Sequence, residues 1–278
     1  MEDLAMSSSF IIIIVSLPIA CVLGALLGSG PPEQRERENL SLGERFHRET
    51  AITWSGVIAD MFTGKPRNPP PYKTYPGARV IQLPPAKYRG KSVEECIEQR
   101  RSLRNYSAKL ISLPQLSQLL HAAQGVTGAM YGQPLRSAPS AGALYPFEIY
   151  AVVNRVQGLD RGLYHYAVRE HALELVKGGD VRSEISSAGL EQDMLGEANV
   201  TFVLAAVVNR MRHKYGERGY RYVYIEAGHI SQNIYLQAVS LGLGSVSVGA
   251  FYDEKLNQLL GIDGREEIAI YIHAVGAL

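Results

Sequence analysis

The pattern of apolar and polar residues along positions 92–278 predicts strands and helices in turn. Apolar runs of strand length cover 147–153, 200–208, 245–251 and 268–275, and two further runs, 162–168 and 172–176, form a hairpin pair. Helical spacing covers 92–100, 112–124, 180–188, 220–241 and 253–260. Because the hairpin interrupts the alternation of strand and helix, we predict an α+β fold with a mixed central β-sheet flanked by helices.

Two of these helices begin at residues typical of capping boxes. Ser92 precedes Glu95 by three positions, and Ser112 precedes Gln115 by the same spacing. Gly125 follows the second helix and predicts its end.

The N-terminal part of the chain predicts a membrane anchor. Residues 10–27 are almost all apolar, and at 1.5 Å per residue they would form a helix about 27 Å long. No Lys or Arg precedes this run, whereas Arg35 and Arg37 follow it. The positive-inside rule then places the body of the protein on the cytoplasmic side. We assign residues 1–28 to this anchor, with a cleaved signal or lipoprotein segment as the alternative.

Residues 29–90 differ in composition from the rest of the chain. Their first part is polar and rich in Pro, Glu and Arg, which is typical of a tether. Residues 66–85 hold many prolines, which exclude a long helix and favour an extended arm laid over the surface. We therefore predict a linker and arm over 29–90 and a folded domain over 91–278.

Charge and cysteine content narrow the function classes. The formal net charge is +1, which argues against a nucleic-acid binder that works through bulk positive charge. Cys21 and Cys96 are far apart and lie in unlike contexts, so neither a disulfide framework nor a cysteine metal site is expected. We predict no metal among the site residues.

The most suggestive polar cluster is Arg-x-Ser-x-Arg at positions 100–104. In an extended segment, Arg100, Ser102 and Arg104 point the same way. Two guanidinium groups that flank a hydroxyl fit a phosphate or the polar edge of a heterocycle. A solvated basic helix end is the alternative interpretation. A second stretch, 135–145, consists of small and polar residues that let a flat ligand approach the backbone.

Four sequence blocks together resemble the nitroreductase family of flavoproteins, in particular its SagB/ThcOx-type dehydrogenase branch. The blocks are Arg100–Arg104, Pro139–Pro146, Lys214–Arg221, and Glu226–His229 followed by Gln232-Asn233. The resemblance covers about residues 44–278. It implies a nitroreductase-like FMN-binding domain over 91–278 and a homodimer with FMN at the subunit interface.

The resemblance also implies roles for individual residues. Arg100, Ser102 and Arg104 would reach the flavin ring edge and its phosphate. A loop from the partner subunit would pack against the isoalloxazine, and its residues are Pro139, Ser140, Ala141, Gly142 and Ala143. The backbone of Val248, Gly249 and Ala250 would lie near flavin N5.

One position departs from the family pattern. Family members often carry Arg or Lys after the last strand's glycine to hold the phosphate, but here Gly276 is followed only by Ala277 and Leu278. Phosphate binding would then rest on Arg100 and Arg104, with Arg210 or Arg212 as further candidates.

A proton-transfer pair is also implied. In azoline oxidases of this branch a Lys-Tyr pair serves as the base, and the matching residues are Lys214 and Tyr215. A solvated loop whose Tyr packs on the sheet is an equally open interpretation. We expect His229 to be a core histidine, and Glu226 to shape the flavin pocket or the dimer face.

The leading hypothesis is thus an FMN-dependent oxidoreductase that transfers hydride between substrate and flavin N5. Its substrate could be an azoline in a modified peptide, oxidised to the azole. The alternatives are an NAD(P)H-dependent enzyme on small electrophiles and a non-catalytic, membrane-tethered scaffold with a flavin fold. Flavin release and NAD(P)H oxidation would distinguish these three.

Overall fold

A computed structural model describes residues 40–54, 64–87 and 89–278. The chain divides into two units, residues 1–51 and residues 52–278. In the first unit, helix α3 (Leu42–Glu49) begins at a capping box formed by Ser41 and Glu44. The second unit holds all the residues that we predicted for a site.

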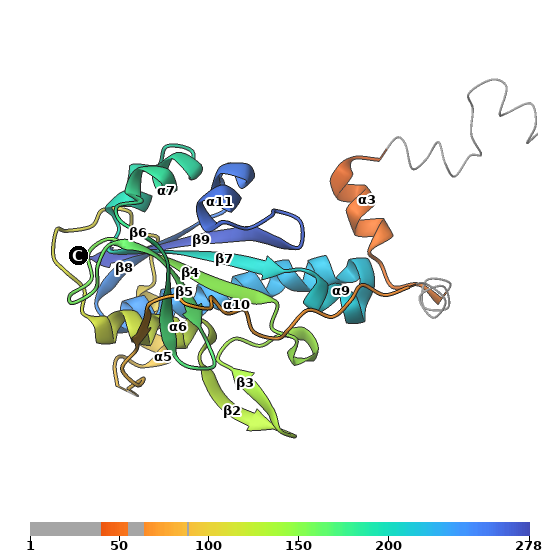
Figure 1. Ribbon diagram of the computed structural model, residues 1–278, viewed down its shortest axis with the longest axis horizontal. Helices are drawn as coiled ribbons and strands as arrows, with labels where there is room; N and C mark the ends of the chain where they lie inside the picture. Colours follow the sequence, from red (N-terminus) through yellow and green to blue (C-terminus); the bar gives the residue numbers. More distant parts are fainter. Residues whose placement is uncertain (1–39, 55–63, 88) are drawn as a thin grey trace, which may run out of the picture. The chain divides into compact units, whose positions relative to one another are not determined.

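The second unit is built on one large sheet. Among its described residues, seven strands pair in the order β1-β6-β5-β4-β7-β9-β8. The bounds are β1 (Val80–Gln82), β4 (Phe147–Val153), β5 (Gly162–Ala167), β6 (Ala172–Gly178), β7 (Val200–Val207), β8 (Leu243–Val248) and β9 (Glu267–Ala277). A separate hairpin of β2 (Val126–Met130) and β3 (Gln133–Arg136) projects from the sheet (Figure 1).

The α+β fold is confirmed, but all neighbouring strands of the large sheet are antiparallel, which corrects our prediction of a mixed sheet. Strands β7 and β8 do run in the same direction, and helix α10 (Gly219–Ser240) lies between them in the chain. However, β9 sits between the two strands in the sheet and pairs with both. The sequence pattern does not reveal that a strand lies between β7 and β8, because that strand, β9, comes last in the chain.

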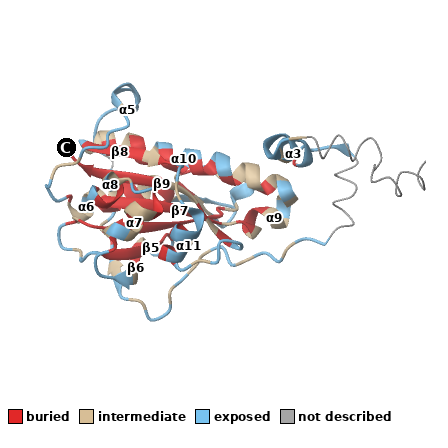
Figure 2. Ribbon diagram, turned by 90° about the horizontal axis from the view of Figure 1, so that it is seen from above, coloured by how far each residue is buried: buried red, intermediate tan, exposed pale blue. Residues whose placement is uncertain are grey.

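Helices cover both faces of the sheet (Figures 1 and 2). Along β4, Phe147 and Ile149 join a core with α6 and α10, whereas Tyr150 and Val152 join a second core with α7 and α11. The bounds are α6 (Leu113–Gln124), α7 (Arg182–Ala188), α8 (Asp193–Glu197) and α11 (Asp253–Leu260). Burial on both faces explains why the central strands appear as continuous apolar runs in the sequence.

The predicted helix starts are confirmed. Ser92 caps α5 (Val93–Gln99) and Ser112 caps α6, each through a complete capping box. The sequence pattern missed several short elements, which are the β2–β3 hairpin, α8 and α9 (Asn209–Tyr215). Elements this short carry too few positions for a periodic signal.

Part of the Pro-rich arm is fastened to the sheet. Its strand β1 pairs with β6 at one edge. Lys73 Nζ lies 2.6 Å from Glu267 Oε2, and the Tyr75 hydroxyl lies 2.9 Å from that of Tyr150. The extended course of the arm therefore agrees with the high proline content of this stretch.

The predicted membrane-anchored localisation is corrected. In the part of the chain that the structure describes, no helix combines the length and the apolar character that crossing a bilayer requires. Residues 1–28, to which we assigned the anchor, lie outside the described residues.

Candidate functional site

The basic cluster lies in an extended segment beside β8. Arg100 ends helix α5 as its C-cap, and the chain then runs along the edge strand. Ser102 forms a parallel bridge with Ser245, and the Leu103 N–H donates a hydrogen bond to the Ser245 carbonyl at 2.9 Å. Ser102 and Arg104 are exposed. These side chains are therefore available to a ligand.

Tyr235 of α10 joins this segment to the end of β8. Its hydroxyl lies 3.1 Å from Ser102 Oγ and accepts a hydrogen bond from the Ser247 N–H at 2.8 Å. The guanidinium carbon of Arg100 lies 5.1 Å from the centre of the Tyr235 ring. Strand β8 ends at Val248, so Gly249 and Ala250 lie just beyond it and are exposed. The structure thus places Ser102 beside strand β8 and Gly249 and Ala250 just after its end.

The loop Pro139–Ala143 has a tight backbone. It contains the 3-10 turn η1 (Ala141–Ala143), and the Ser140 hydroxyl accepts a hydrogen bond from the Tyr145 N–H at 2.9 Å. The φ angles of Gly142, Ala143 and Tyr145 are 62°, 53° and 45°. Ala143 in the loop and Tyr145 just after it are not glycine, so both hold a left-handed conformation that costs energy. Such strain is typical of ligand-binding loops.

The structure places Lys214 and Tyr215 against this loop. They are the last two residues of α9, a short helix where we considered a loop. A Cβ atom added to Gly142 would lie 2.8 Å from Lys214 Nζ and 2.7 Å from the Tyr215 hydroxyl oxygen. A side chain at position 142 would therefore have to displace both polar tips. Lys214 is exposed, and the Tyr215 ring meets that of Tyr222 edge-on at 4.9 Å.

Glu226 lies behind the loop and was undervalued by the sequence interpretation. It is 2% exposed, and its Oε2 atom has no hydrogen-bond partner in the described part of the protein. Burial raises the pKa of this carboxyl to about 7, although interactions with Ser140, Arg136 and Gln124 act in the opposite direction. Its carboxyl therefore changes charge near neutral pH. Glu226 stands one residue before Ala227 and four before Ile230 in the buried stripe of α10, but the sequence of this helix does not separate that stripe sharply from the exposed face.

Two other predictions about polar residues are wrong. His229 is exposed rather than a core histidine, because the buried stripe of α10 passes through Ala227 and Ile230 on either side of it. Arg210 is not available for a phosphate, since it is buried and its Nη2 atom lies 2.6 Å from Glu148 Oε1. Arg212 pairs with Glu217 at 2.5 Å.

The predicted residues thus form two groups in one subunit. Helix α10 carries Glu226 behind the 139–143 loop and Tyr235 beside Ser102. These two helix positions are nine residues apart, which is about 13.5 Å along the axis. The group around Ser102 and Tyr235 offers hydroxyls and guanidinium groups. The group around Glu226 and the 139–143 loop offers a tight backbone with an amine and a phenol. Together they have the donors that a planar cofactor with a phosphate requires, so the residues present fit FMN.

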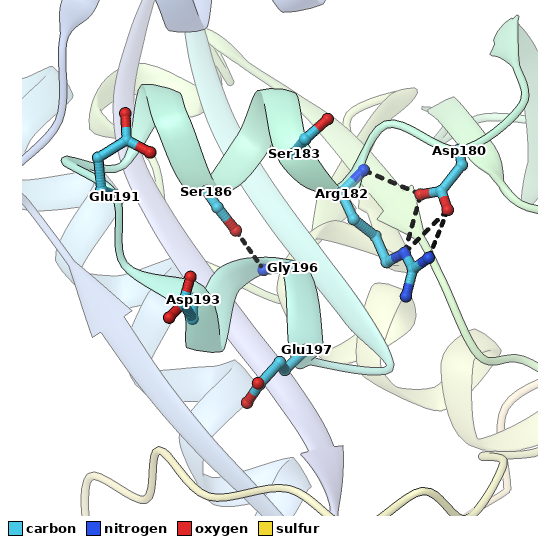
Figure 3. A pocket seen from close by; sticks show the side chains of 8 residues that line it. All are labelled: Asp180, Arg182, Ser183, Ser186, Glu191, Asp193, Gly196 and Glu197. Carbon is cyan, nitrogen blue, oxygen red and sulfur yellow. Dashed lines mark hydrogen bonds and ion pairs between the residues drawn. The ribbon is translucent and has the colours of Figure 1, made fainter.

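A separate hollow of about 540 Å³ lies between α7 and α8 (Figure 3). Its lining is mostly acidic and polar, with Asp180, Glu191, Asp193 and Glu197 among its residues. Hydrogen bonds from Arg182 lower the pKa of Asp180 to about 2, so this pair is satisfied within the protein. None of the predicted site residues lines this hollow, and we assign it no role.

Comparison with known proteins matches residues 97–277 to the nitroreductase family. The protein MJ1384 of Methanocaldococcus jannaschii, whose name places it among nitroreductases, is 42% identical over 170 residues, which are 61% of this chain and 84% of that protein. The microcin B17-processing protein McbC of Escherichia coli is 28% identical over 150 residues, which are 52% of this chain and 55% of McbC. This similarity therefore extends over about half of McbC.

Solved structures share the fold. A nitroreductase structure from Anabaena variabilis superimposes with a TM-score of 0.68 at 29% identity, over 84% of this chain and 46% of the other. The Escherichia coli microcin synthetase McbBCD complex with truncated pro-MccB17 bound gives a TM-score of 0.56 at 22% identity, over 94% and 92% of the two chains. At that identity the second likeness concerns the fold alone. The family match, in contrast, runs through most of the second unit and includes every residue that we predicted for the site; this chain belongs to the nitroreductase family.

Proposed function

We propose that this protein is an FMN-dependent oxidoreductase in which Lys214 and Tyr215 handle the substrate proton. The observation that carries the proposal is the close approach of both polar tips to Gly142, in the loop that the family resemblance assigns to the flavin ring. Membership in a family of flavin oxidoreductases supports the assignment.

The remaining predicted residues take the roles that the resemblance gives them. Arg100, Ser102 and Arg104 would bind the phosphate and ring edge, and the backbone at 248–250 would approach the reactive side of the ring. Bound FMN would supply a two-electron acceptor that takes a hydride at N5. The chain itself would remove one proton, at Lys214 Nζ or at the Tyr215 hydroxyl.

We further propose an azoline ring in a modified peptide as the substrate. Oxidation to the azole removes two electrons and two protons, one as hydride and one at the Lys214–Tyr215 pair. Similarity to McbC, whose name assigns it to microcin B17 processing, supports this choice. The similarity to MJ1384 favours a second candidate, an NAD(P)H-dependent reductase of small electrophiles. Rapid bleaching of the bound flavin by NAD(P)H alone would favour the second candidate over the first.

The cofactor gives the direct test. Purified protein, or protein reconstituted with flavin, should be yellow and should release FMN rather than FAD on heating. FMN carries one phosphate, and the described residues of the two groups offer donors for one. FAD is a dinucleotide, and the sequence has no GxGxxG fingerprint after a strand to hold it. Chromatography of the released flavin identifies it. A colourless protein that takes up no flavin would instead support the scaffold hypothesis.

We also propose that two copies pair through the exposed face of α10. Ile225, Gly228, His229 and Gln232 form one exposed stripe on this helix, and Ile225 is 55% exposed. Gly228 lies within this stripe, where glycine costs the isolated helix about 1 kcal/mol relative to alanine. A Cβ atom there would meet nothing within 4 Å inside the subunit. The absence of a side chain at Gly228 would let a second copy approach α10 closely. Such pairing would bring one group of site residues from each subunit together.

Replacing Gly228 by lysine should therefore separate the dimer without unfolding the subunit. An unpaired charge buried at an interface costs about 2 kcal/mol or more, so the dimer should dissociate at least about 30-fold more readily. Light scattering across a range of protein concentrations measures this change. Glu254→Lys, an exposed change on α11, serves as the control and should remain dimeric. An unchanged mass for the Gly228 variant would show that the two copies pair elsewhere.

A further inference from the structure

Two buried arginines lie between the Pro-rich arm and the loop that faces Lys214 and Tyr215. Arg136 is the last residue of strand β3, and Arg210 lies in the first turn of α9. Their exposed fractions are 7% and 3%. Because burial of a guanidinium group costs free energy unless its N–H groups find acceptors, the partners of these two side chains show what they do.

Both arginines hold backbone carbonyls of the arm. Arg136 Nη2 donates a hydrogen bond to the Pro71 carbonyl at 3.4 Å, and Arg210 Nε donates one to the Pro70 carbonyl at 2.7 Å. The guanidinium carbon of Arg136 also lies 5.1 Å from the centre of the Tyr72 ring. Proline has no N–H, so the carbonyl is the only backbone hydrogen-bonding group at these two positions. Three successive residues of the arm are therefore fastened to the arginines.

The same two arginines hold Tyr145, which follows the loop 139–143. The Arg136 backbone N–H donates to the Tyr145 hydroxyl at 3.1 Å, and the Arg136 guanidinium carbon lies 4.8 Å from the centre of that ring. Arg210 Nη1 donates to the Tyr145 carbonyl at 3.4 Å. The Tyr145 N–H in turn donates to the Ser140 hydroxyl oxygen at 2.9 Å. The side chain and backbone of Tyr145 thus connect the arginines to the loop.

The backbone conformation of this stretch needs support from outside the loop. Ala143 and Tyr145 have φ angles of 53° and 45°, and residues with a side chain keep such angles only where surrounding contacts compensate for the strain. Relaxation of either angle would redirect the chain and move Gly142 relative to Lys214 and Tyr215. The contacts of Tyr145 with the two arginines supply this compensation.

Stability alone does not account for Arg136. Its Nη1 atom donates to Gln124 Oε1 at 3.2 Å, but its Nε atom has no hydrogen-bond partner, and no carboxylate among the described residues forms an ion pair with it. A buried cation of this kind costs stability. We propose that Arg136 is a positioning residue that ties the Pro-rich arm to Tyr145 and so holds the 139–143 loop against the proton-transfer pair. This proposal rests on the proposed flavin-dependent function.

Hydrogen–deuterium exchange of the flavin-free protein tests this role without any turnover. Arg136→Lys keeps the charge, but one amine does not replace the planar guanidinium in its contacts on both sides. Tyr72→Ala removes the ring on the arm and leaves the loop sequence unchanged. In both variants we expect the amides of Ala143 and Tyr145 to exchange about 5-fold faster or more, because their hydrogen bonds with Ser140 weaken.

Turnover gives a second readout. The flavin-loaded variants, at equal flavin content, are assayed with a synthetic thiazoline-containing peptide. We expect kcat to fall about 10-fold or more while KM stays within about a factor of two, because the proton-transfer pair is intact but no longer aligned with the loop. Arg79→Ala is the matched control on the arm. It breaks an exposed ion pair with Asp160 at 3.0 Å and should change neither the exchange of the loop nor turnover.

The outcomes separate this inference from the proposed function. Unchanged exchange at Ala143 and Tyr145 in both variants, or faster exchange with unchanged kcat, would overturn the positioning role. Exchange that rises equally throughout the central sheet would overturn it as well, because Arg136 would then support the whole fold rather than the loop. A wild-type protein that turns over neither the thiazoline peptide nor NAD(P)H would overturn the proposed function. The exchange measurement, which needs no flavin, would still decide whether Arg136 holds the loop.

Discussion

Replacing Lys214 by alanine should lower turnover of the substrate by about 10²–10⁴, the usual range for a lost general acid or base. Tyr215→Phe should have an effect in the same range, because it removes the second polar tip that faces Gly142. Neither change creates a buried cavity, since Lys214 is exposed and phenylalanine keeps the ring contact between Tyr215 and Tyr222. Both variants should therefore remain folded, dimeric and yellow.

Steady-state kinetics at saturating substrate, with flavin content measured by absorbance, tests this prediction. Lys177→Ala is a matched control, because it removes an exposed lysine whose partner is the surface residue Glu184 at 3.4 Å. Activity that survives both site substitutions within a factor of a few would show that the pair is structural. Loss of flavin from both variants would instead assign the pair to the cofactor site.

Replacing Glu148 by alanine should lower the free energy of unfolding by about 3–5 kcal/mol, because it leaves a buried charge without its partner. Glu148 Oε1 lies 2.6 Å from Arg210 Nη2, and Oε2 lies 2.9 Å from His165 Nε2. The other ring nitrogen of His165 lies 2.8 Å from Glu174 Oε2. The Lys73 N–H also donates a hydrogen bond to Glu148 Oε1 at 3.2 Å. Loss of the carboxylate should therefore loosen the Pro-rich arm as well.

Chemical denaturation of the flavin-free protein at one fixed concentration measures the effect. The control is Glu184→Ala, which breaks an exposed ion pair and should cost less than about 1 kcal/mol. If Glu148→Ala lowered the free energy of unfolding as little as this control, water or a rearranged side chain would have to compensate the buried charge of Arg210.

The same variant carries a pH signature. Burial raises the pKa of Glu148, but the hydrogen bond with His165 and the charge of Arg210 outweigh burial and hold the folded pKa below its ordinary value of 4.5. The stabilisation from the ionised carboxylate is then fully present above pH 4.5 and is lost as the pH falls through the folded pKa. The difference between wild type and Glu148→Ala should accordingly shrink on acidification.

Local sequence determined the elements and the residue types of the site. Ser92 and Ser112 specify helix starts because their hydroxyls cap backbone N–H groups within the next turn. The long apolar runs specify strands because each is buried on both faces. The extended course of residues 100–104 also follows locally, since the chain leaves α5 at Arg100. The helix starts and the course of 100–104 depend on residues that are close in the chain, whereas the strands can be predicted because burial on both faces leaves a continuous apolar run in the sequence.

Burial within α10 required the tertiary structure. Glu226 and His229 are three positions apart in one helix, yet the first is buried and the second exposed. Almost the whole helix is rich in apolar residues, so its sequence gives no sharp boundary between the buried and exposed faces. Only packing against α6 and the sheet decides which side faces inward, and with it the raised pKa of Glu226.

Pairing over long distances was likewise decided by the tertiary structure. Strand β9 is last in the chain but lies between β7 and β8, so a sheet that seemed mixed is antiparallel. Gly142 meets Lys214 and Tyr215, and Ser102 meets Tyr235, across separations of more than 70 residues. The sequence by itself supplied these residues and their local conformations. Their contacts depend on how the helices and strands pack together, because nothing in the neighbouring sequence encodes the distance between two remote segments.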